Sequence, residues 1–169
     1  MQQIETWLSL ISNYINKLSK CILFIVVIAM FSAVFLQVFF RYVVGYSLAW
    51  SEEVTMFLMA WMTFIGSAIA LKHWQHISVD IIPGLVKGKN SIILSMIIKI
   101  ITFMFFYYLL TGGWNFAVGS RNIYADGINL SLFWPRLSMV IGSLFMLVHL
   151  LYMLISDYNS LITVRGNDK

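Results

Sequence analysis

Hydrophobic residues fall into four long runs along the chain, and short polar segments separate them. The runs cover residues 21–40, 54–71, 92–111 and 137–156. A helix of about 20 residues rises about 30 Å, which is the hydrocarbon thickness of a bilayer. The pattern therefore predicts an all-α integral membrane protein with four transmembrane helices, and it predicts a single membrane domain over residues 1–169.

Residues 1–20 follow a different pattern, because apolar and polar positions recur there with helical periodicity. The apolar positions are Ile4, Trp7, Leu8, Ile11, Tyr14, Ile15 and Leu18, and polar residues such as Glu5, Asn13 and Lys17 fill the other face. This spacing predicts an N-terminal amphipathic helix, which we expect to lie in the membrane interface ahead of the first span. The alternative is a solvated extension of that span.

The composition excludes a water-soluble fold. The chain is 60% hydrophobic and 11% charged, whereas a soluble domain carries about 25% charged residues. The net charge of +4 comes from single basic residues in the termini and loops, so no stripe for nucleic-acid binding is visible. Cys21 is the only cysteine, which excludes a disulfide within the chain, a thiolate metal cluster and a Cys-x-x-Cys redox pair.

Positive charges predict the orientation in the membrane. The two terminal segments and the connector at 72–90 hold seven Lys and Arg residues, whereas the segments on the other side hold three, with Lys99 left out because it lies within a span. Cytoplasmic segments of membrane proteins carry the excess of positive charge. We therefore expect both termini in the cytoplasm, with the hairpin at 41–53 and the loop at 112–135 facing outward.

The hairpin between the first two spans gathers charged and aromatic residues. Arg41 closes the first run, Glu52 and Glu53 open the second, and Tyr42 and Trp50 lie between them. We expect an ion pair between Arg41 and one of the two glutamates, which ties the first two helices together. The alternative is that this acidic and aromatic corner docks another protein. Ser51 is a candidate N-cap of the second helix.

A carrier for a hydrophilic solute needs ionisable groups or broken helices in the middle of the membrane. The four predicted spans contain no Asp, Glu or Pro, so the chain is a poor candidate for transport by itself. Lys99 is the one charge well inside a span, and it either extends to the cytoplasmic headgroups or meets a carbonyl or acid on a partner. Gly66 and Ala70 form a small-residue pair that lets another helix approach closely.

The three histidines leave one cofactor alternative open. They do not match a zinc-protease pattern, but His73 or His76 together with His149 has the topology of a haem-ligand pair between helices. On that reading the chain is a four-helix membrane anchor of an electron-transfer complex. The plainer reading is interfacial histidines with ordinary hydrogen bonds. A third alternative, a small self-sufficient exporter, would have to use Lys99 as its mid-membrane ionisable site.

Four short motifs together resemble one known family. They are Gln37-Val38-x-x-Arg41-Tyr42, then Trp50-Ser51-Glu52-Glu53, then Trp61 through Gly66-Ser67-Ala68, then His76-Ile77-x-Val79-Asp80. In order and spacing they resemble the small membrane subunit of a tripartite ATP-independent periplasmic (TRAP) transporter. The length, the four spans and the cytoplasmic location of both termini also agree with this family. The second half of the chain matches it only in hydropathy and layout.

The resemblance implies a scaffolding role in the bacterial inner membrane, with no enzymatic activity and no cofactor. A large multi-span subunit would carry the substrate and sodium sites, and a soluble periplasmic protein would capture an organic acid such as a C4-dicarboxylate, a keto acid or sialic acid. The residues expected to brace helices or dock partners are Gln37, Arg41, Tyr42, Trp50, Glu52, Glu53, Gly66, His76, Asp80 and Lys99.

Overall fold

Four long helices make up the fold. The computed structural model describes the backbone of residues 2–81 and 89–167, and the side chains of residues 5–73 and 92–162. The helices are α1 (Gln2–Phe39), α2 (Ala49–Ile81), α3 (Lys89–Gly119) and α4 (Phe133–Asn167), and a π-helical turn, η1 (Phe40–Val44), extends α1. Each contains a stretch long and apolar enough to cross a membrane, so the prediction of an all-α membrane protein with four spanning helices is confirmed.

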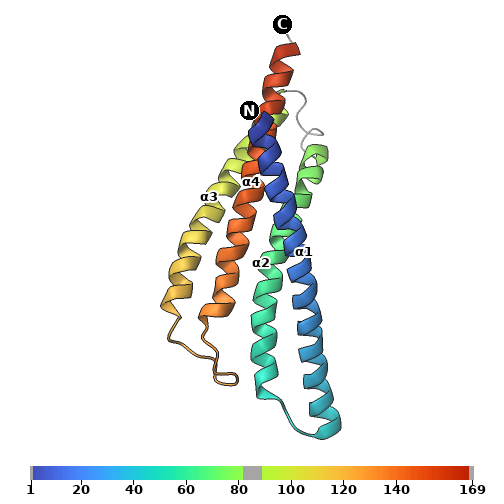
Figure 1. The fold of residues 1–169 in the computed structure, drawn as a ribbon, viewed down its shortest axis with the longest axis vertical. Helices are drawn as coiled ribbons and strands as arrows, with labels where there is room; N and C mark the ends of the chain where they lie inside the picture. Colours follow the sequence, from blue (N-terminus) through green and yellow to red (C-terminus); the bar gives the residue numbers. More distant parts are fainter. Residues whose placement is uncertain (1, 82–88, 168–169) are drawn as a thin grey trace.

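The helices lie side by side in the order α3, α4, α2, α1 (Figure 1). Both termini are at one end of the bundle, and the two connections that follow α1 and α3 are at the other end. Near its N-terminus α1 also contacts α4. α1 with α2, and α3 with α4, form two antiparallel pairs, because the short connection within each pair returns the chain beside the preceding helix.

The predicted interfacial helix at 1–20 is not separate from the first span, which corrects that expectation. The segment is amphipathic, but α1 continues without interruption from Gln2 to Phe39. No Gly or Pro lies in this stretch to break the helix. At about 1.5 Å per residue α1 is about 57 Å long, so it extends well beyond a bilayer of about 30 Å. The alternative reading, an extension of the first span, describes this helix better.

The other helices also extend past their predicted spans. The connector predicted at 72–90 is helical in its first half, because α2 continues to Ile81. The loop predicted at 112–135 is shorter, because α3 includes Gly112 and Gly113 and ends at Gly119. Pro135 lies in the first turn of α4, where its missing N–H costs no hydrogen bond.

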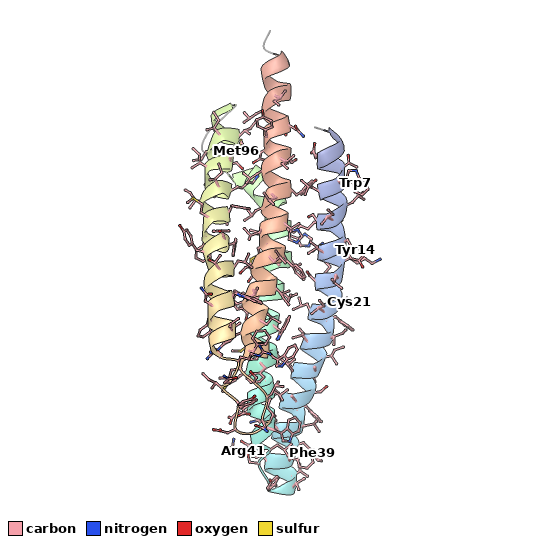
Figure 2. All side chains as sticks on the ribbon, turned by 60° about the vertical axis from the view of Figure 1, so that its left-hand side comes forward. Trp7, Tyr14, Cys21, Phe39, Arg41 and Met96 are labelled. Atoms are coloured by element: carbon pink, nitrogen blue, oxygen red, sulfur yellow. The ribbon has the colours of Figure 1, made fainter. Side chains whose placement is uncertain are left out.

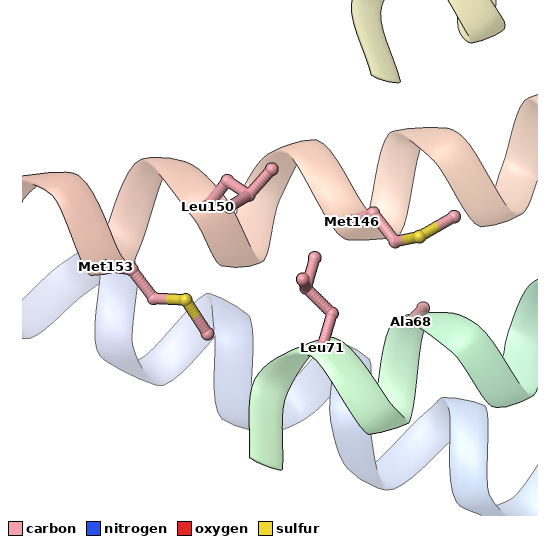
Figure 3. Close-up of a cluster of buried hydrophobic side chains, with 5 residues drawn as sticks. All are labelled: Ala68, Leu71, Met146, Leu150 and Met153. Atoms are coloured by element: carbon pink, nitrogen blue, oxygen red, sulfur yellow. The ribbon is translucent and has the colours of Figure 1, made fainter. Parts of the chain in front are cut away.

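The buried core is small and joins α2 to α4. It consists of Ala68 and Leu71 from α2 with Met146, Leu150 and Met153 from α4 (Figure 3). A side chain at Gly142 of α4 would meet Cβ of Phe64 at 2.6 Å, so the two backbones approach closely there. In the most apolar stretch of each helix, 44% of residues are buried in α4 but only 6% in α1 and none in α3. Most of the apolar surface of α1 and α3 thus faces outward.

Candidate functional site

The corner between α1 and α2 is shaped by the π-helical turn. η1 is followed by Gly45, whose φ of +78° is one that residues with a side chain rarely adopt. The N–H of Tyr46 donates to the carbonyl of Phe40 at 3.1 Å, which closes the turn. Arg41 and Tyr42 lie within η1 and are exposed, and Figure 2 shows Arg41 at this end of the bundle. The turn therefore presents a cation and an aromatic ring outward.

The prediction of an ion pair between Arg41 and Glu52 or Glu53 is wrong. Among the side chains that the structure describes, Arg41 is within ion-pair distance of neither glutamate. The reason is that η1 continues the helix past Arg41, so the chain reverses only after that side chain has turned outward. Glu52 is exposed as well. The two helices are connected here by the backbone turn and not by opposite charges.

Glu53 instead binds the loop between α3 and α4. Its Oε2 accepts hydrogen bonds from the backbone N–H of Gly127 at 2.9 Å and of Ile128 at 3.1 Å. A side chain at Gly127 would lie 3.0 Å from that same oxygen and 3.3 Å from the carbonyl oxygen of Ala49. The absence of a side chain at Gly127 therefore allows the loop to approach Glu53 and Ala49 closely. The sequence pattern singled out Glu53 but predicted Arg41 as its partner. Its actual partner, Gly127, lies 74 residues away along the chain.

Two further predictions at the start of α2 have different outcomes. Ser51 is not an N-cap, because α2 begins at Ala49 and the Ser51 hydroxyl donates to the carbonyl of Leu48 at 2.7 Å. Trp50 is 38% exposed, so the ring remains available at the surface. Arg41, Tyr42 and Trp50 together form an exposed polar and aromatic edge along the turn from α1 to α2.

Gln37 and Gly66 lie along the membrane-spanning parts of α1 and α2. Gln37 is partly buried. At Gly66 an added Cβ would meet nothing within 4 Å, and Ala70 one turn later is exposed. The small-residue face predicted for α2 is therefore not used within the chain and is open to another helix. The close helix contact that the chain does make uses Gly142, which sequence reasoning did not select.

Lys99 pairs within the chain, and neither expected arrangement describes it. Its Nζ donates to Oδ2 of Asp157 on α4 at 2.6 Å, and Ser95 Oγ donates to the same oxygen at 3.2 Å. The Lys99 side chain is 10% exposed and that of Asp157 21%. Asp157 was missed because it lies one residue beyond the predicted end of the fourth span. The pair connects α3 to α4 and neutralises the intramembrane charge.

A second group of polar contacts joins the N-terminal half of α1 to its neighbours. Nδ1 of His149 on α4, which is fully buried, lies 2.8 Å from Oγ of Ser12. Lys72 of α2 donates to Oδ1 of Asn13 at 2.6 Å. Asn159 donates to Oε2 of Glu5 at 2.6 Å. These bonds explain why this half of α1 follows the bundle.

Of the two histidine pairs considered as haem ligands, only His73 with His149 lies among the described side chains. His73 is exposed, whereas His149 is enclosed and bonded to Ser12. His76 and Asp80 lie on the last turns of α2, and their side chains fall outside the described residues. Within residues 5–73 and 92–162, no three His, Cys, Asp or Glu side chains gather as a metal site would require.

Comparison with known proteins identifies the family of this chain. The family model of the DctQ component of tripartite ATP-independent periplasmic transporters matches residues 14–159. The chain is 24% identical over 112 residues to the C4-dicarboxylate TRAP transporter small permease protein DctQ of Vibrio cholerae, which covers 66% of this chain and 48% of that protein. It is 26% identical over 104 residues to a putative TRAP transporter small permease protein of Haemophilus influenzae, covering 62% and 65%.

A third relative is matched over most of its length. The sialic acid TRAP transporter small permease protein SiaQ of Vibrio cholerae is 23% identical over 141 residues, which are 82% of this chain and 80% of that protein. The chain spans about half the length of the C4-dicarboxylate relative. The family model itself includes α2 and α3 and most of α1 and α4. The chain therefore belongs to the family of DctQ components of tripartite ATP-independent periplasmic transporters.

Proposed function

We propose that the chain is the small, non-catalytic scaffolding subunit of a sodium-coupled organic-acid importer. In this role it packs beside a large membrane subunit, which carries the substrate and sodium sites. A soluble periplasmic protein delivers the acid. Family membership supports a place in a transporter, and the names of two relatives, which refer to C4-dicarboxylate and to sialic acid, support an organic acid as the class of substrate.

The observation that best supports the scaffolding role is that the buried charge of Lys99 is paired within the chain. Lys99, the cation inside a span, is neutralised by Asp157. A substrate anion or a coupling cation would have to displace one member of this pair, and leaving the other buried and unpaired costs several kcal/mol. The described interior includes a hydrophobic seam between α2 and α4. A supporting subunit fits this interior better than a carrier.

The outward surfaces support partners of two kinds. The apolar faces of α1 and α3, with the open position at Gly66, suit contact with a large membrane subunit. The exposed edge formed by Arg41, Tyr42 and Trp50 along the turn from α1 to α2 suits a soluble partner. With the orientation predicted from the positive charges, this edge faces the periplasm and both termini face the cytoplasm.

Co-expression with the large subunit tests the proposal. The two chains should purify as one complex, and sodium-driven uptake in proteoliposomes should require both of them together with the binding protein. This chain reconstituted alone should concentrate no organic acid. Uptake by the lone chain, or full uptake by the large subunit without it, would contradict the scaffolding role.

A further inference from the structure

A hollow of about 470 Å³ lies at the loop end of α3 and α4. Figure 1 shows this end, where the loop returns the chain from α3 to α4. The hollow is lined by Trp114, Arg121, Tyr124, Ser131, Phe133 and Trp134. Its size is within the range of small-molecule sites in proteins, about 300–1,000 Å³. Aromatic rings and one guanidinium thus surround a space large enough for a ligand.

Backbone contacts hold the walls of the hollow in place. The loop is paired across its neck by an isolated β-bridge between Tyr124 and Ser131. The hydroxyl of Ser131 donates to the carbonyl of Arg121 at 2.7 Å and accepts from the N–H of Phe133 at 3.2 Å. At the tip, Glu53 binds the N–H of Gly127. The site is therefore built before any ligand arrives, which lowers the entropic cost of binding.

Two arginines near the α3–α4 loop, Arg121 and Arg136, have different surroundings. The guanidinium carbon of Arg136 lies 3.9 Å from the centroid of the Phe116 ring. Arg121 lines the hollow and is exposed, and no carboxylate among the described side chains pairs with it. A guanidinium presents a planar set of donors that matches a phosphate group. The lining contains one formal charge, and its sign favours an anion.

The position of the hollow selects the source of that anion. The apolar stretches of α3 and α4 end at Gly119 and begin at Phe133, so the hollow lies at the boundary of the membrane. Trp114 and Trp134 are about half exposed there, and indole rings favour the headgroup layer. We propose that this hollow binds the headgroup of an anionic phospholipid, with the phosphate on Arg121 and the glycerol region against the tryptophans.

Lipid binding by the full-length chain tests this site. Native mass spectrometry in detergent, with phosphatidylglycerol as the probe, should show one retained lipid. We expect Arg121→Gln to weaken that retention about tenfold, because the charge-assisted contact is lost. Arg41→Gln is the matched control, since Arg41 is also exposed at this end but does not line the hollow. Equal retention by wild type and Arg121→Gln would overturn the proposal.

A second variant and two further measurements distinguish lipid binding from the alternatives. Arg121→Lys keeps the charge but loses the planar donor pair, so it should retain the lipid more weakly than wild type even if Arg121→Gln does not fold. Retention by Arg121→Lys equal to wild type would overturn the phosphate contact. Displacement of the lipid by millimolar inorganic phosphate would assign the site to a soluble anion. If Arg121→Gln leaves lipid retention unchanged but abolishes binding of the periplasmic protein, the hollow would be assigned to protein docking. Both results would also overturn the proposal.

Discussion

At the scale of single residues, the polar side chains that matter are those whose partners lie far along the chain. Glu53 holds the loop through two backbone N–H groups. Lys99 and Asp157 hold α3 to α4. Ser12 and His149 hold the start of α1 to α4. Each of these contacts satisfies groups that would be costly to leave unpaired near or within a membrane.

Replacing Glu53 should loosen the loop. Glu53→Ala removes the acceptor for Gly127 and Ile128, and we expect the free energy of unfolding to fall by about 1–2 kcal/mol because these bonds are partly exposed to solvent. Thermal unfolding in detergent measures the change. Glu52→Ala is the control, because this neighbouring carboxylate is exposed and its loss should leave the melting temperature unchanged. Equal effects of the two substitutions would contradict the loop contact.

Breaking the Lys99–Asp157 pair should destabilise the chain more. Lys99→Met leaves a carboxylate without its counter-ion, and we expect a loss of about 3 kcal/mol. The double variant Lys99→Met, Asp157→Leu removes both charges and should recover much of this loss. Melting temperatures of Lys99→Met, of Asp157→Leu and of the double variant together give the coupling between the two sites. Strictly additive losses would show that the two side chains do not interact.

At the scale of elements, close packing of α2 on α4 and continuity of α1 determine the bundle. The seam between α2 and α4 depends on Gly142, which allows the backbone of one helix to approach Phe64 of the other. α1 continues as one helix up to η1, and its N-terminal half contacts both α2 and α4. The third helix packs mainly on α4.

A methyl group at Gly142 should separate α2 from α4. The added carbon would lie 2.6 Å from Cβ of Phe64 and 3.0 Å from its carbonyl oxygen, so we expect Gly142→Ala to cost about 1–3 kcal/mol of stability. Gly112→Ala in α3 is a matched control, because an added carbon there meets nothing within 4 Å. It should leave stability unchanged or raise it by about 0.5–1 kcal/mol. Thermal unfolding of both variants checks the contrast.

At the scale of the whole molecule, burial is unequal between the helices. α4 has neighbours on several sides, whereas α1 and α3 form the two outer edges of the bundle. Figure 2 shows Trp7 and Tyr14 on the outer side of α1, and both are largely exposed. Such edges suit lipid or a second membrane subunit, which is the role proposed above.

The open position at Gly66 offers a test of assembly. Gly66→Leu should leave the melting temperature of the isolated chain nearly unchanged, because nothing within the chain lies near an added Cβ. The same change should weaken co-purification with the large subunit about tenfold if that subunit packs against this face. A variant that assembles normally would remove this face of α2 from the proposed interface.

Much of the architecture was predictable from local patterns. The four spans follow from hydropathy, because the transfer of about 20 apolar residues into a bilayer depends on composition and little on neighbours. Glu53 and Lys99 stood out as charges at the edge of or inside such runs. Their partners did not, because Gly127 contributes only its backbone and Asp157 lies just outside the predicted span. Hydropathy also could not separate residues 1–20 from a continuation of the first helix.

The amino-acid sequence by itself determined that this chain is a four-helix membrane protein, and its motifs indicated the transporter family. Tertiary structure alone decided which groups meet. Glu53 meets Gly127 over 74 residues, Lys99 meets Asp157 over 58, and Ser12 meets His149 over 137. The physical reason is that insertion into a bilayer sums local transfer energies, whereas a hydrogen bond or a close helix contact depends on the positions of two atoms that only the packed helices bring together.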